Sequence, residues 1–511
     1  MSREYLEDAM QEISDEYLEE AVEWKPAEAR VTAKRQKTQQ SGALGKAHDR
    51  KRVRVWRVAV ALVTAVAVIA AAVFGFGGVH FGRRASVLKA FAISEAEYPK
   101  TSPYPDPAKY GLGEPNENYE AFDAAYDAWW EEQRNRRSQA SVIGDGLDGF
   151  WQQSISAFLK GAGEENRVYS PVNVYMALAM LAEITDGDSR QQVIDLLGIK
   201  SVEELREQAT AVWTANYMND GASTSILGSS LWLRNDMEYK KPVLETLANT
   251  YYASSYRGEM GSEKMNQAFQ TWLNEQTGGL LEDYVEGETL SEETILALAS
   301  TIYYQAKWTD EFFDEKNEDG VFHSPVGDVP CEFMYEYMDM GGTYYWGEKF
   351  GAVEKRLDNS HRMWFILPDE GVSVDELLQE AEVMNFFIAD EWENQKAMNV
   401  HFYLPKFDVS SKMDLREGLK TLGVTDVFDG SLADFSTVTD LKGMCLSKAN
   451  HAARVTVDEE GVTAVAYTVM EVDGARPSQE EEIEFRLDRP FLFAIMGTGD
   501  VPLFVGVVNR P

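Results

Sequence analysis

The chain has 511 residues, of which 44% are hydrophobic and 12% aromatic, so it can bury a sizeable core and is not an intrinsically disordered protein. Its formal charge is −37, and residues 1–57 hold 12 Lys/Arg against 11 Asp/Glu, so the negative charge belongs to the rest of the chain. A field of this sign repels phosphate backbones, which excludes nucleic acid as a partner, and we interpret the acidity as a solvated surface. Cys331 and Cys445 are too few for a disulfide scaffold, and we expect both thiols to be free and buried.

The N-terminal part carries a membrane signal. Residues 1–24 are acidic with apolar residues at helical spacing, which predicts a short amphipathic helix, and residues 30–57 are strongly basic. Residues 58–79 form an uncharged, mostly apolar run. At ~1.5 Å per residue this run is about 33 Å long, enough to cross a bilayer core. The basic flank precedes it, so the positive-inside rule predicts a cytoplasmic segment 1–57, a transmembrane helix 58–79 and an extracellular remainder at the cell membrane. A cleaved signal peptide is the alternative.

Residues 80–138 are predicted to form an extracytoplasmic stalk. Five of the 16 prolines of the chain lie between Pro99 and Pro115, and this density favours an extended backbone over a helix. Residues 118–137 regain helical periodicity through Phe122, Tyr126, Trp129 and Trp130. We expect an accessory helix whose aromatic residues pack on the main domain.

Residues 139–511 show helices first and strands later, without β-α alternation, which predicts an α+β domain. The expected helices lie within residues 147–159, 172–197 and 265–276, the last one ending at Gly278-Gly279. The expected strands lie at residues 362–367, 400–404, 454–457, 483–487, 491–495 and 503–508.

The sequence carries no catalytic motif that we recognise. It has no GxSxG elbow, HExxH, P-loop or CxxC motif. Its six histidines are scattered, and no two stand at metal-ligand spacing. We therefore expect no enzymatic activity, no cofactor and no metal.

Residues 459–479 form an unusual stretch of small, β-compatible residues between two predicted strands. From Val462 to Gly474 every second position is uncharged, while Glu471 and Asp473 fall on the other parity. Since the two parities of a strand face opposite sides, this segment is able to lie in a sheet with small residues inward and charges outward.

Several motifs of residues 139–511 resemble those of a known protein family. Gly461, with its acidic lead Glu459-Glu460 and its alanine-rich continuation, resembles the hinge and reactive loop of serpins. Further serpin-like motifs follow in family order along residues 139–511: Tyr169-Ser-Pro-Val-Asn-Val, Trp272 with Thr277 and Gly279, Thr301-Ile-Tyr-Tyr-Gln-Ala-Lys-Trp308, Leu404-Pro-Lys-Phe, Leu446-Ser-Lys-Ala-Asn-His451, Asp488-Arg-Pro-Phe and Pro502-Leu-Phe-Val-Gly. With the membrane run, the chain is similar to a membrane-anchored serpin, which we take to be bacterial and monomeric.

The resemblance implies the serpin fold, with helices around a large sheet, smaller sheets and an exposed reactive loop. It implies a suicide inhibitor of serine proteases: the protease cleaves the loop, is trapped as an acyl-enzyme, and the loop inserts into the central sheet. The spacing usual in the family places the reactive bond at Ala475-Arg476, which favours elastase-like or subtilisin-like targets over trypsin-like ones. The implied hinge and insertion residues are Glu459, Glu460, Gly461, Val462, Thr463, Ala464, Val465, Ala466 and Thr468, and the implied sheet-opening residues are Ser170, Asn173, Ser300, Trp308 and His451.

Two departures from the family pattern stand out. Inhibitory serpins usually have Thr or Ser and then Glu after the hinge glycine, where this chain has Val462 and Thr463. The residue types at Asn173 and Ser300 are exchanged relative to the family, which predicts that the pair keeps a shared hydrogen bond with His451. The uncharged residues at the inward positions favour an inhibitor. The alternative is a non-inhibitory serpin used as a surface binding module, and a third hypothesis is a secreted hydrolase.

Overall fold

The computed structural model describes residues 87–111, 118–143, 145–279, 281, 285, 287–338, 342–388, 392–462 and 481–511. The predicted cytoplasmic segment and the predicted membrane helix 58–79 lie outside these residues. Within the described ranges, no helix is long and apolar enough to cross a bilayer.

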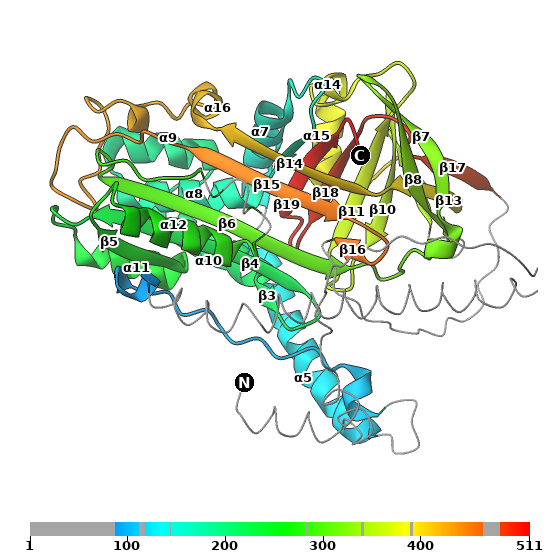
Figure 1. Cartoon of the computed structure of the whole chain (residues 1–511), viewed down its shortest axis with the longest axis horizontal. Coiled ribbons are helices and arrows are strands. Elements are labelled where there is room, and N and C mark those ends of the chain that lie inside the picture. The colour runs from blue at the N-terminus through cyan, green and yellow to red at the C-terminus, as the bar shows by residue number, and fades with distance from the viewer. Residues whose placement is uncertain are drawn as a thin grey trace, which may run out of the picture. The chain divides into compact units, whose positions relative to one another are not determined.

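The main architectural element is an eight-stranded central sheet in the order β1-β5-β4-β6-β16-β15-β14, with β3 paired to β4 (Figure 1). Its two longest strands, β4 and β6, pair antiparallel along their length, from Thr224↔Gln305 to Leu233↔Leu296. The strands are β1 (Ala92–Ser94), β3 (Met218–Asn219), β4 (Thr224–Arg234), β5 (Ala253–Gly258), β6 (Leu296–Lys307), β14 (Phe407–Asp414), β15 (Asn450–Val457) and β16 (Gly461–Val462).

Two further sheets complete the domain. A seven-stranded sheet in the order β12-β9-β10-β11-β18-β19-β2 holds the apolar C-terminal strands in its interior. A four-stranded sheet has the order β17-β13-β8-β7. The strands of the first are β2 (Arg167–Tyr169), β9 (Thr343–Trp346), β10 (Phe350–Arg356), β11 (Arg362–Pro368), β12 (Gln395–Ala397), β18 (Phe491–Met496) and β19 (Pro502–Val508), and those of the second are β7 (Glu318–Ser324), β8 (Gly327–Met338), β13 (Asn399–Pro405) and β17 (Glu482–Arg486).

Helices cover both faces of the central sheet. On β4, Leu231 and Leu233 belong to the main core with α8, whereas Trp232 belongs to a second cluster with Phe269 and Trp272 of α12. Because neighbouring residues of a strand face opposite sides, α8 and α12 lie on opposite faces. The helices are α5 (Tyr119–Ser138), α6 (Ala140–Ile143), α7 (Asp148–Leu159), α8 (Pro171–Ile184), α9 (Gly187–Leu197), α10 (Val202–Asn216), α11 (Lys241–Thr250), α12 (Glu263–Gln276), α14 (Val374–Leu377), α15 (Ala381–Ile388) and α16 (Arg416–Thr421), with short 3-10 turns at Pro107–Tyr110, Asp145–Leu147, Asp314–Lys316 and Asp426–Phe428.

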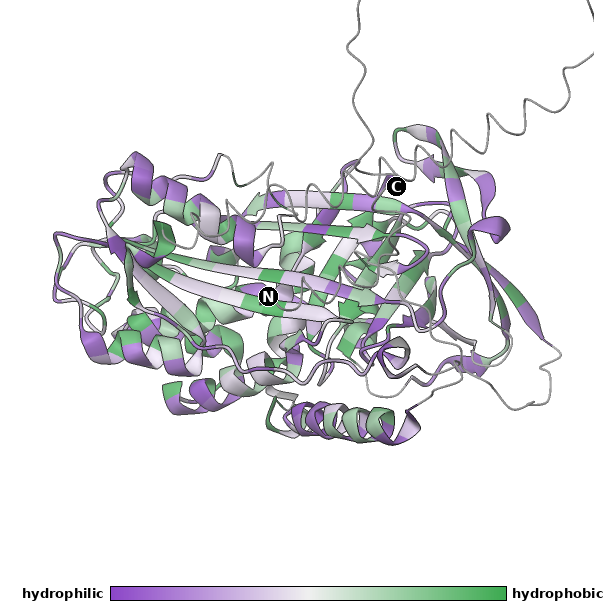
Figure 2. Ribbon diagram, turned by 60° about the horizontal axis from the view of Figure 1, so that its bottom comes forward, coloured by the Kyte–Doolittle hydropathy of each residue, from purple (hydrophilic) through white to green (hydrophobic). Residues whose placement is uncertain are grey.

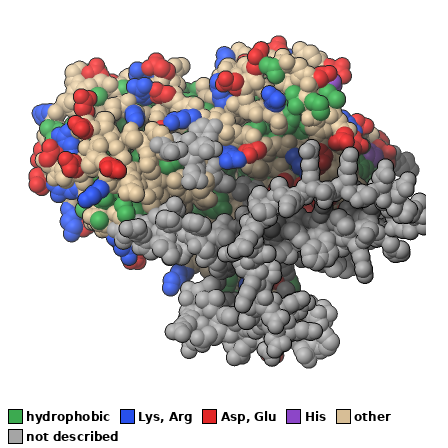
Figure 3. All heavy atoms as spheres, viewed as in Figure 1, with side chains coloured by type: hydrophobic (Ala, Val, Ile, Leu, Met, Phe, Trp, Pro, Cys, Tyr) green, Lys and Arg blue, Asp and Glu red, His purple; other side chains and the backbone are tan. Residues whose placement is uncertain are grey.

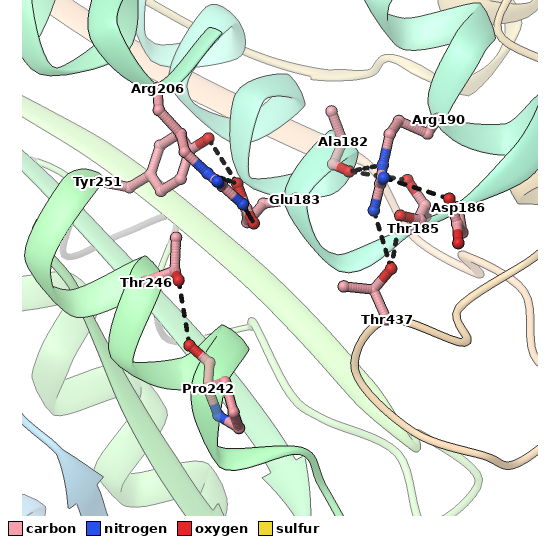
Figure 4. Close-up of polar contacts among 10 residues, drawn as sticks. All are labelled: Ala182, Glu183, Thr185, Asp186, Arg190, Arg206, Pro242, Thr246, Tyr251 and Thr437. Carbon is pink, nitrogen blue, oxygen red and sulfur yellow. Dashed lines mark hydrogen bonds and ion pairs between the residues drawn. The ribbon is translucent and has the colours of Figure 1, made fainter. Parts of the chain in front are cut away.

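The α+β prediction is confirmed, and the predicted strands within residues 362–508 all form. Residues 172–197 were predicted to contain an apolar helix, and α8 confirms this prediction; a second helix, α9, follows within the same range. Thr185 and Asp186 adopt extended backbone and Gly187 has φ +55°, so the helix breaks there. Figure 4 shows how side chains fix both halves. Buried Glu183 at the end of α8 accepts from Arg206 at 2.5 and 2.9 Å, and from Tyr251 at 3.1 Å.

The predicted accessory helix is present as α5 and packs on the domain. Trp129 is buried, and its indole N–H donates to Asp220 at 2.9 Å, while Arg136 is buried and donates to the Tyr217 carbonyl. Upstream of it, β1 adds an edge strand to the central sheet by pairing with β5. Residues 87–138 are therefore part of the packed domain where they are described, which a free stalk would not be.

The surface is polar and mixed in sign. Acidic and basic side chains are interspersed on the face shown in Figure 3, in agreement with the solvated-surface interpretation of the acidity. In Figure 2, green hydrophobic residues alternate with purple hydrophilic ones along the helices, and many strands are green or pale. The cysteine prediction is half wrong: Cys331 and Cys445 are free, but Cys331 is only partly buried and Cys445 is exposed.

Candidate functional site

The predicted hinge is a tight reversal between β15 and β16. The Asp458 carboxylate accepts the backbone N–H groups of Glu460 and Gly461, both at 3.1 Å, which closes an Asx-type turn. A Cβ on Gly461 would lie 2.3 Å from the carbonyl oxygen of Ala306. Only glycine allows this close approach, so the sequence places the hinge glycine where β16 enters the sheet.

Trp308 and Phe312 donate hydrogen bonds to the carbonyl groups of this turn. The Trp308 indole N–H donates to the Asp458 carbonyl at 2.9 Å, and its backbone N–H donates to the Glu460 carbonyl at 3.0 Å. The backbone N–H of Phe312 donates to the Glu459 carbonyl at 3.0 Å. All three carbonyls of the turn are therefore bonded to one short segment after β6. Trp308 was predicted among the sheet-opening residues, and the structure places it at the hinge turn instead.

The Glu459 side chain adds an ion pair and a hydrogen bond that the sequence did not predict. Its side chain is 13% exposed, pairs with Lys406, and accepts from the Asn317 amide at 2.5 Å. Burial works against ionisation of Glu459, but Lys406 and Asn317 outweigh it and lower the pKa of this carboxyl. Lys406 also pairs with Glu332 at 2.6 Å. Glu459 itself was predicted as a hinge residue and Lys406 appeared within the motif Leu404-Pro-Lys-Phe, but nothing in the sequence indicated that the two would pair.

β16 is a short wedge between β6 and β15. Gly461 and Val462 pair antiparallel with Lys307 and Ala306 of β6, and Val462 pairs with Val457 of β15. Val462 is 2% exposed and belongs to the main core. Its inward orientation, expected from the sequence parity, is thus confirmed.

Farther from the hinge, β6 and β15 enclose a cavity. No pairing between these two strands is recorded among the described residues, and a cavity of about 210 Å³ lies between them and the helices α8 and α12. It is lined mainly by apolar side chains with a few polar ones, and Asn173, Ser300 and His451 all contribute to its wall. We call it the β6–β15 cavity.

Four of the five predicted sheet-opening residues, Ser170, Asn173, Ser300 and His451, lie together, but not with the bonding expected. The Ser170 backbone N–H donates to His451 Nε2 at 3.0 Å, and the Ser170 hydroxyl donates to the Leu503 carbonyl at 2.6 Å. Burial lowers the pKa of His451 to about 4, so the ring is neutral at pH 7.

The prediction that Asn173 and Ser300 share a hydrogen bond with His451 is wrong in this structure. His451 Nε2 is occupied by Ser170, and the buried Asn173 Oδ1 has no partner among the described residues. Ser300 pairs in register with Ser229 of β4 and lines the wall of the β6–β15 cavity. Asn173 instead contributes its backbone N–H to the Ser170 hydroxyl at 3.4 Å, which caps α8.

The remaining predicted site residues, Thr463, Ala464, Val465, Ala466, Thr468, Ala475 and Arg476, lie outside the described residues. No group of acidic, histidine and cysteine side chains suited to a metal ion occurs in the described ranges.

Comparisons with known proteins agree with this geometry. The family described as "Serpin (serine protease inhibitor)" matches residues 149–511. Serpin-ZX of Arabidopsis thaliana is 26% identical over 68% of this chain and 92% of its own length, and Neuroserpin of Mus musculus is 26% identical over 71% and 90%. The native state of Tengpin, a thermophilic serpin, is 25% identical with a TM-score of 0.64 over 72% of this chain and 93% of its own. Thyroxine-binding globulin in complex with thyroxine shares the fold, with a TM-score of 0.59 at 20% identity over 73% of this chain and 99% of that one. The chain therefore belongs to the serpin family, a family of protease inhibitors.

Proposed function

We propose that this protein is a suicide inhibitor of serine proteases that works by loop insertion, and that it is not itself an enzyme. The observation that carries the proposal is β16, because its two residues already extend the hinge into the central sheet between β6 and β15. Beyond it, the β6–β15 cavity leaves the two strands without mutual pairing among the described residues. A cleaved loop is then able to continue the same ladder.

The register of β16 gives the positions of the following residues in the inserted state. Continuing Val462↔Ala306 along β6 sets Ala464 opposite Tyr304, Ala466 opposite Ile302 and Thr468 opposite Ser300. Continuing Val462↔Val457 along β15 sets the same three residues opposite Val455, Ala453 and His451. Of these neighbours, Tyr304, Val455, Ala453 and His451 are buried. The small side chains of even parity thus enter the inner face, and Val465 remains on the outer face.

The mechanism requires that loop insertion releases free energy. Each ladder hydrogen bond gained contributes ~0.5–1.5 kcal/mol, so insertion of a dozen residues releases on the order of ten kcal/mol. The uninserted state is then kinetically trapped and must be held closed at the hinge.

A gel assay tests the proposal. The full chain is incubated with an elastase-like and a subtilisin-like protease and analysed on denaturing gels. An SDS-resistant complex with the protease is the expected product. Cleavage of the loop without a complex would refute the trapping mechanism, and turnover of an added substrate by the protein alone would indicate a hydrolase.

The reactive bond is proposed at Ala475-Arg476. A small residue at this position suits proteases with shallow primary pockets, and Pro477 hinders cleavage after Arg476 by a trypsin-like protease. Mass spectrometry of the C-terminal peptide released by elastase tests the position. Cleavage within residues 462–470 would rule it out.

A non-inhibitory binding module is the second candidate function. It is favoured by Val462, an apolar residue where inhibitory serpins usually have Thr or Ser after the hinge glycine, and by the shared fold with thyroxine-binding globulin in complex with thyroxine. Loop cleavage without an SDS-resistant complex is the outcome expected for this candidate.

For the location of the protein we propose a single-pass membrane anchor at residues 58–79, with the serpin domain outside the cell; this anchor and a bacterial origin stay predictions. The proline-rich residues 99–115 suggest a cut there by external protease on intact cells, but residues 99–111 pack on the domain, so we expect the cut that releases the domain between residue 79 and β1. Release only after cell lysis would contradict this orientation.

A further inference from the structure

A lysine is buried inside the hinge end of the domain. Lys355 lies in β10 opposite Met363 of β11, and its side chain is only 3% exposed. Its ammonium donates to the Asp310 carbonyl at 2.7 Å and forms an ion pair with Glu336 of β8, whose side chain is 19% exposed. Burial raises the pKa of Glu336, and Lys355 opposes this shift.

The same ammonium also faces two aromatic rings. Its nitrogen lies 4.4 Å from the centre of the Phe312 ring and 5.5 Å from that of Trp308. Cation–π attraction of this kind strengthens when the cation is removed from water. Lys355 thus contacts the segment 308–312 through one carbonyl and two rings.

That segment is the one that holds the hinge. Trp308 and Phe312 together bond the carbonyls of residues 458–460, as described above. The contacts form a continuous path from Glu336 to Lys355, to the two rings, and to the turn that precedes β16. No side chain in this path belongs to the loop itself.

Burying an ammonium is costly, and replacing a buried ion pair by apolar side chains of similar size is often neutral or stabilising. A buried pair that is not required for stability fits a role in setting a conformational equilibrium. We propose that Lys355, with Glu336 as its counter-ion, is a positioning residue of the hinge: it fixes Trp308 and Phe312 where they hold residues 458–460, and so slows insertion beyond Val462. This inference rests on the proposed insertion of the loop.

The test compares two double variants of the full chain. Lys355→Met with Glu336→Met removes both buried charges while keeping apolar volume. Lys349→Met with Glu380→Met removes a lysine–glutamate pair of 2.6 Å whose side chains are 41% and 44% exposed, and serves as the matched control. The measured quantity is the rate at which each uncleaved protein incorporates a synthetic peptide of residues 463–474, followed by the gain in resistance to urea.

The expected result is incorporation at least ten-fold faster in the Lys355/Glu336 variant and within two-fold of the wild type in the control. A melting temperature at or above that of the wild type is expected for the first variant, since it exchanges a buried ion pair for apolar contacts. The single variant Lys355→Arg keeps the cation, so its rate of peptide incorporation should stay close to the slow rate of the wild type. Equal rates in both double variants, or a lowered melting temperature without a change of rate, would overturn the inference.

Failure of the inference can be told from failure of the proposed function. An inhibitor that forms the SDS-resistant complex but shows no rate change in the Lys355/Glu336 variant refutes only the role of the lysine. A wild type that forms no complex, while this variant still incorporates the peptide faster, refutes inhibition and leaves the hinge role intact.

Discussion

The two ends of the space between β6 and β15 are held in different ways. At the hinge end, the Asp458, Glu459 and Glu460 carbonyls each accept a hydrogen bond, and the Glu459 carboxylate is paired with Lys406. At the other end, the strands border a cavity of about 210 Å³, and the buried Asn173 Oδ1 has no partner among the described residues.

This difference locates the resistance to insertion. Separating β6 from β15 at the cavity end breaks no backbone pairing between these strands in the described residues. Opening at the hinge end requires the charged and aromatic contacts around Trp308 to yield. The hinge end is therefore expected to control the rate, and the cavity end to accept the strand.

Blocking the inner face just past the hinge should have the largest effect. Ala464→Arg would place a charge opposite Tyr304 and Val455, both buried, and an unpaired buried charge outweighs the gain from several ladder bonds. We expect the variant to be cleaved as a substrate, with its stoichiometry of inhibition raised at least ten-fold against an elastase-like protease. Val465→Arg is the control on the outer face, and it should retain most of its trapping. An equal loss in both variants would refute the parity argument.

Releasing the hinge end should have the next largest effect. Glu459→Ala removes the contacts with Lys406 and Asn317, which are worth ~1.5–3 kcal/mol as hydrogen bonds to charged groups. Faster spontaneous loop insertion or polymerisation on warming is expected, measured by native gels over time. Glu332→Ala also takes one carboxylate from Lys406 and from Asn317 but does not touch the hinge, so it should convert more slowly than Glu459→Ala. The reverse order would place the restraint elsewhere.

The outcome for the sequence predictions follows the same division. Long-range features carried by continuous patterns were predictable: the apolar runs at 491–495 and 503–508 form strands in the interior of a sheet, and Val462 faces inward as its parity requires. The hinge glycine and Trp308 were found through family motifs.

Single contacts between distant segments were not predictable. Lys355 and Glu336 meet across two sheets, and a lysine among core residues carries no spacing signal that distinguishes it from a surface lysine. The interpretation of Asn173 and Ser300 failed for a related reason. Residue types suggested a shared partner for them, but the backbone N–H of Ser170 takes His451 Nε2, and a backbone donor leaves no trace in the sequence.

Acid should weaken the cavity end. The pKa of His451 is lowered by burial to about 4, against ~6.5 in an unfolded chain. Between these values the unfolded state binds more protons than the folded state. The stabilising contribution of the neutral His451 is therefore fully present above pH 6.5 and is lost as the pH falls toward 4, and its total is about 3 kcal/mol. Urea unfolding at pH 7.5 and pH 5 should show a smaller acid loss in His451→Gln than in the wild type. His401→Gln, on the outer four-stranded sheet, is the control, and equal acid losses in all three proteins would contradict the assignment.

The smallest effect is expected at Asn173, and it tests the corrected hydrogen-bond arrangement. The Asn173 side chain is buried, and its carbonyl oxygen has no partner within the part of the chain that the structure describes. Asn173→Ala therefore removes an unsatisfied polar group and enlarges the cavity slightly, and the net change in unfolding free energy should stay within ~1 kcal/mol. Ser170→Ala is the matched comparison one turn away. It loses the bond to the Leu503 carbonyl and the cap of α8, and should cost ~1–2 kcal/mol. A double-mutant cycle of Asn173→Ala with Ser300→Ala should show no coupling. A cost above 2 kcal/mol for Asn173→Ala, together with coupling to Ser300, would restore the shared hydrogen bond that the family pattern suggested.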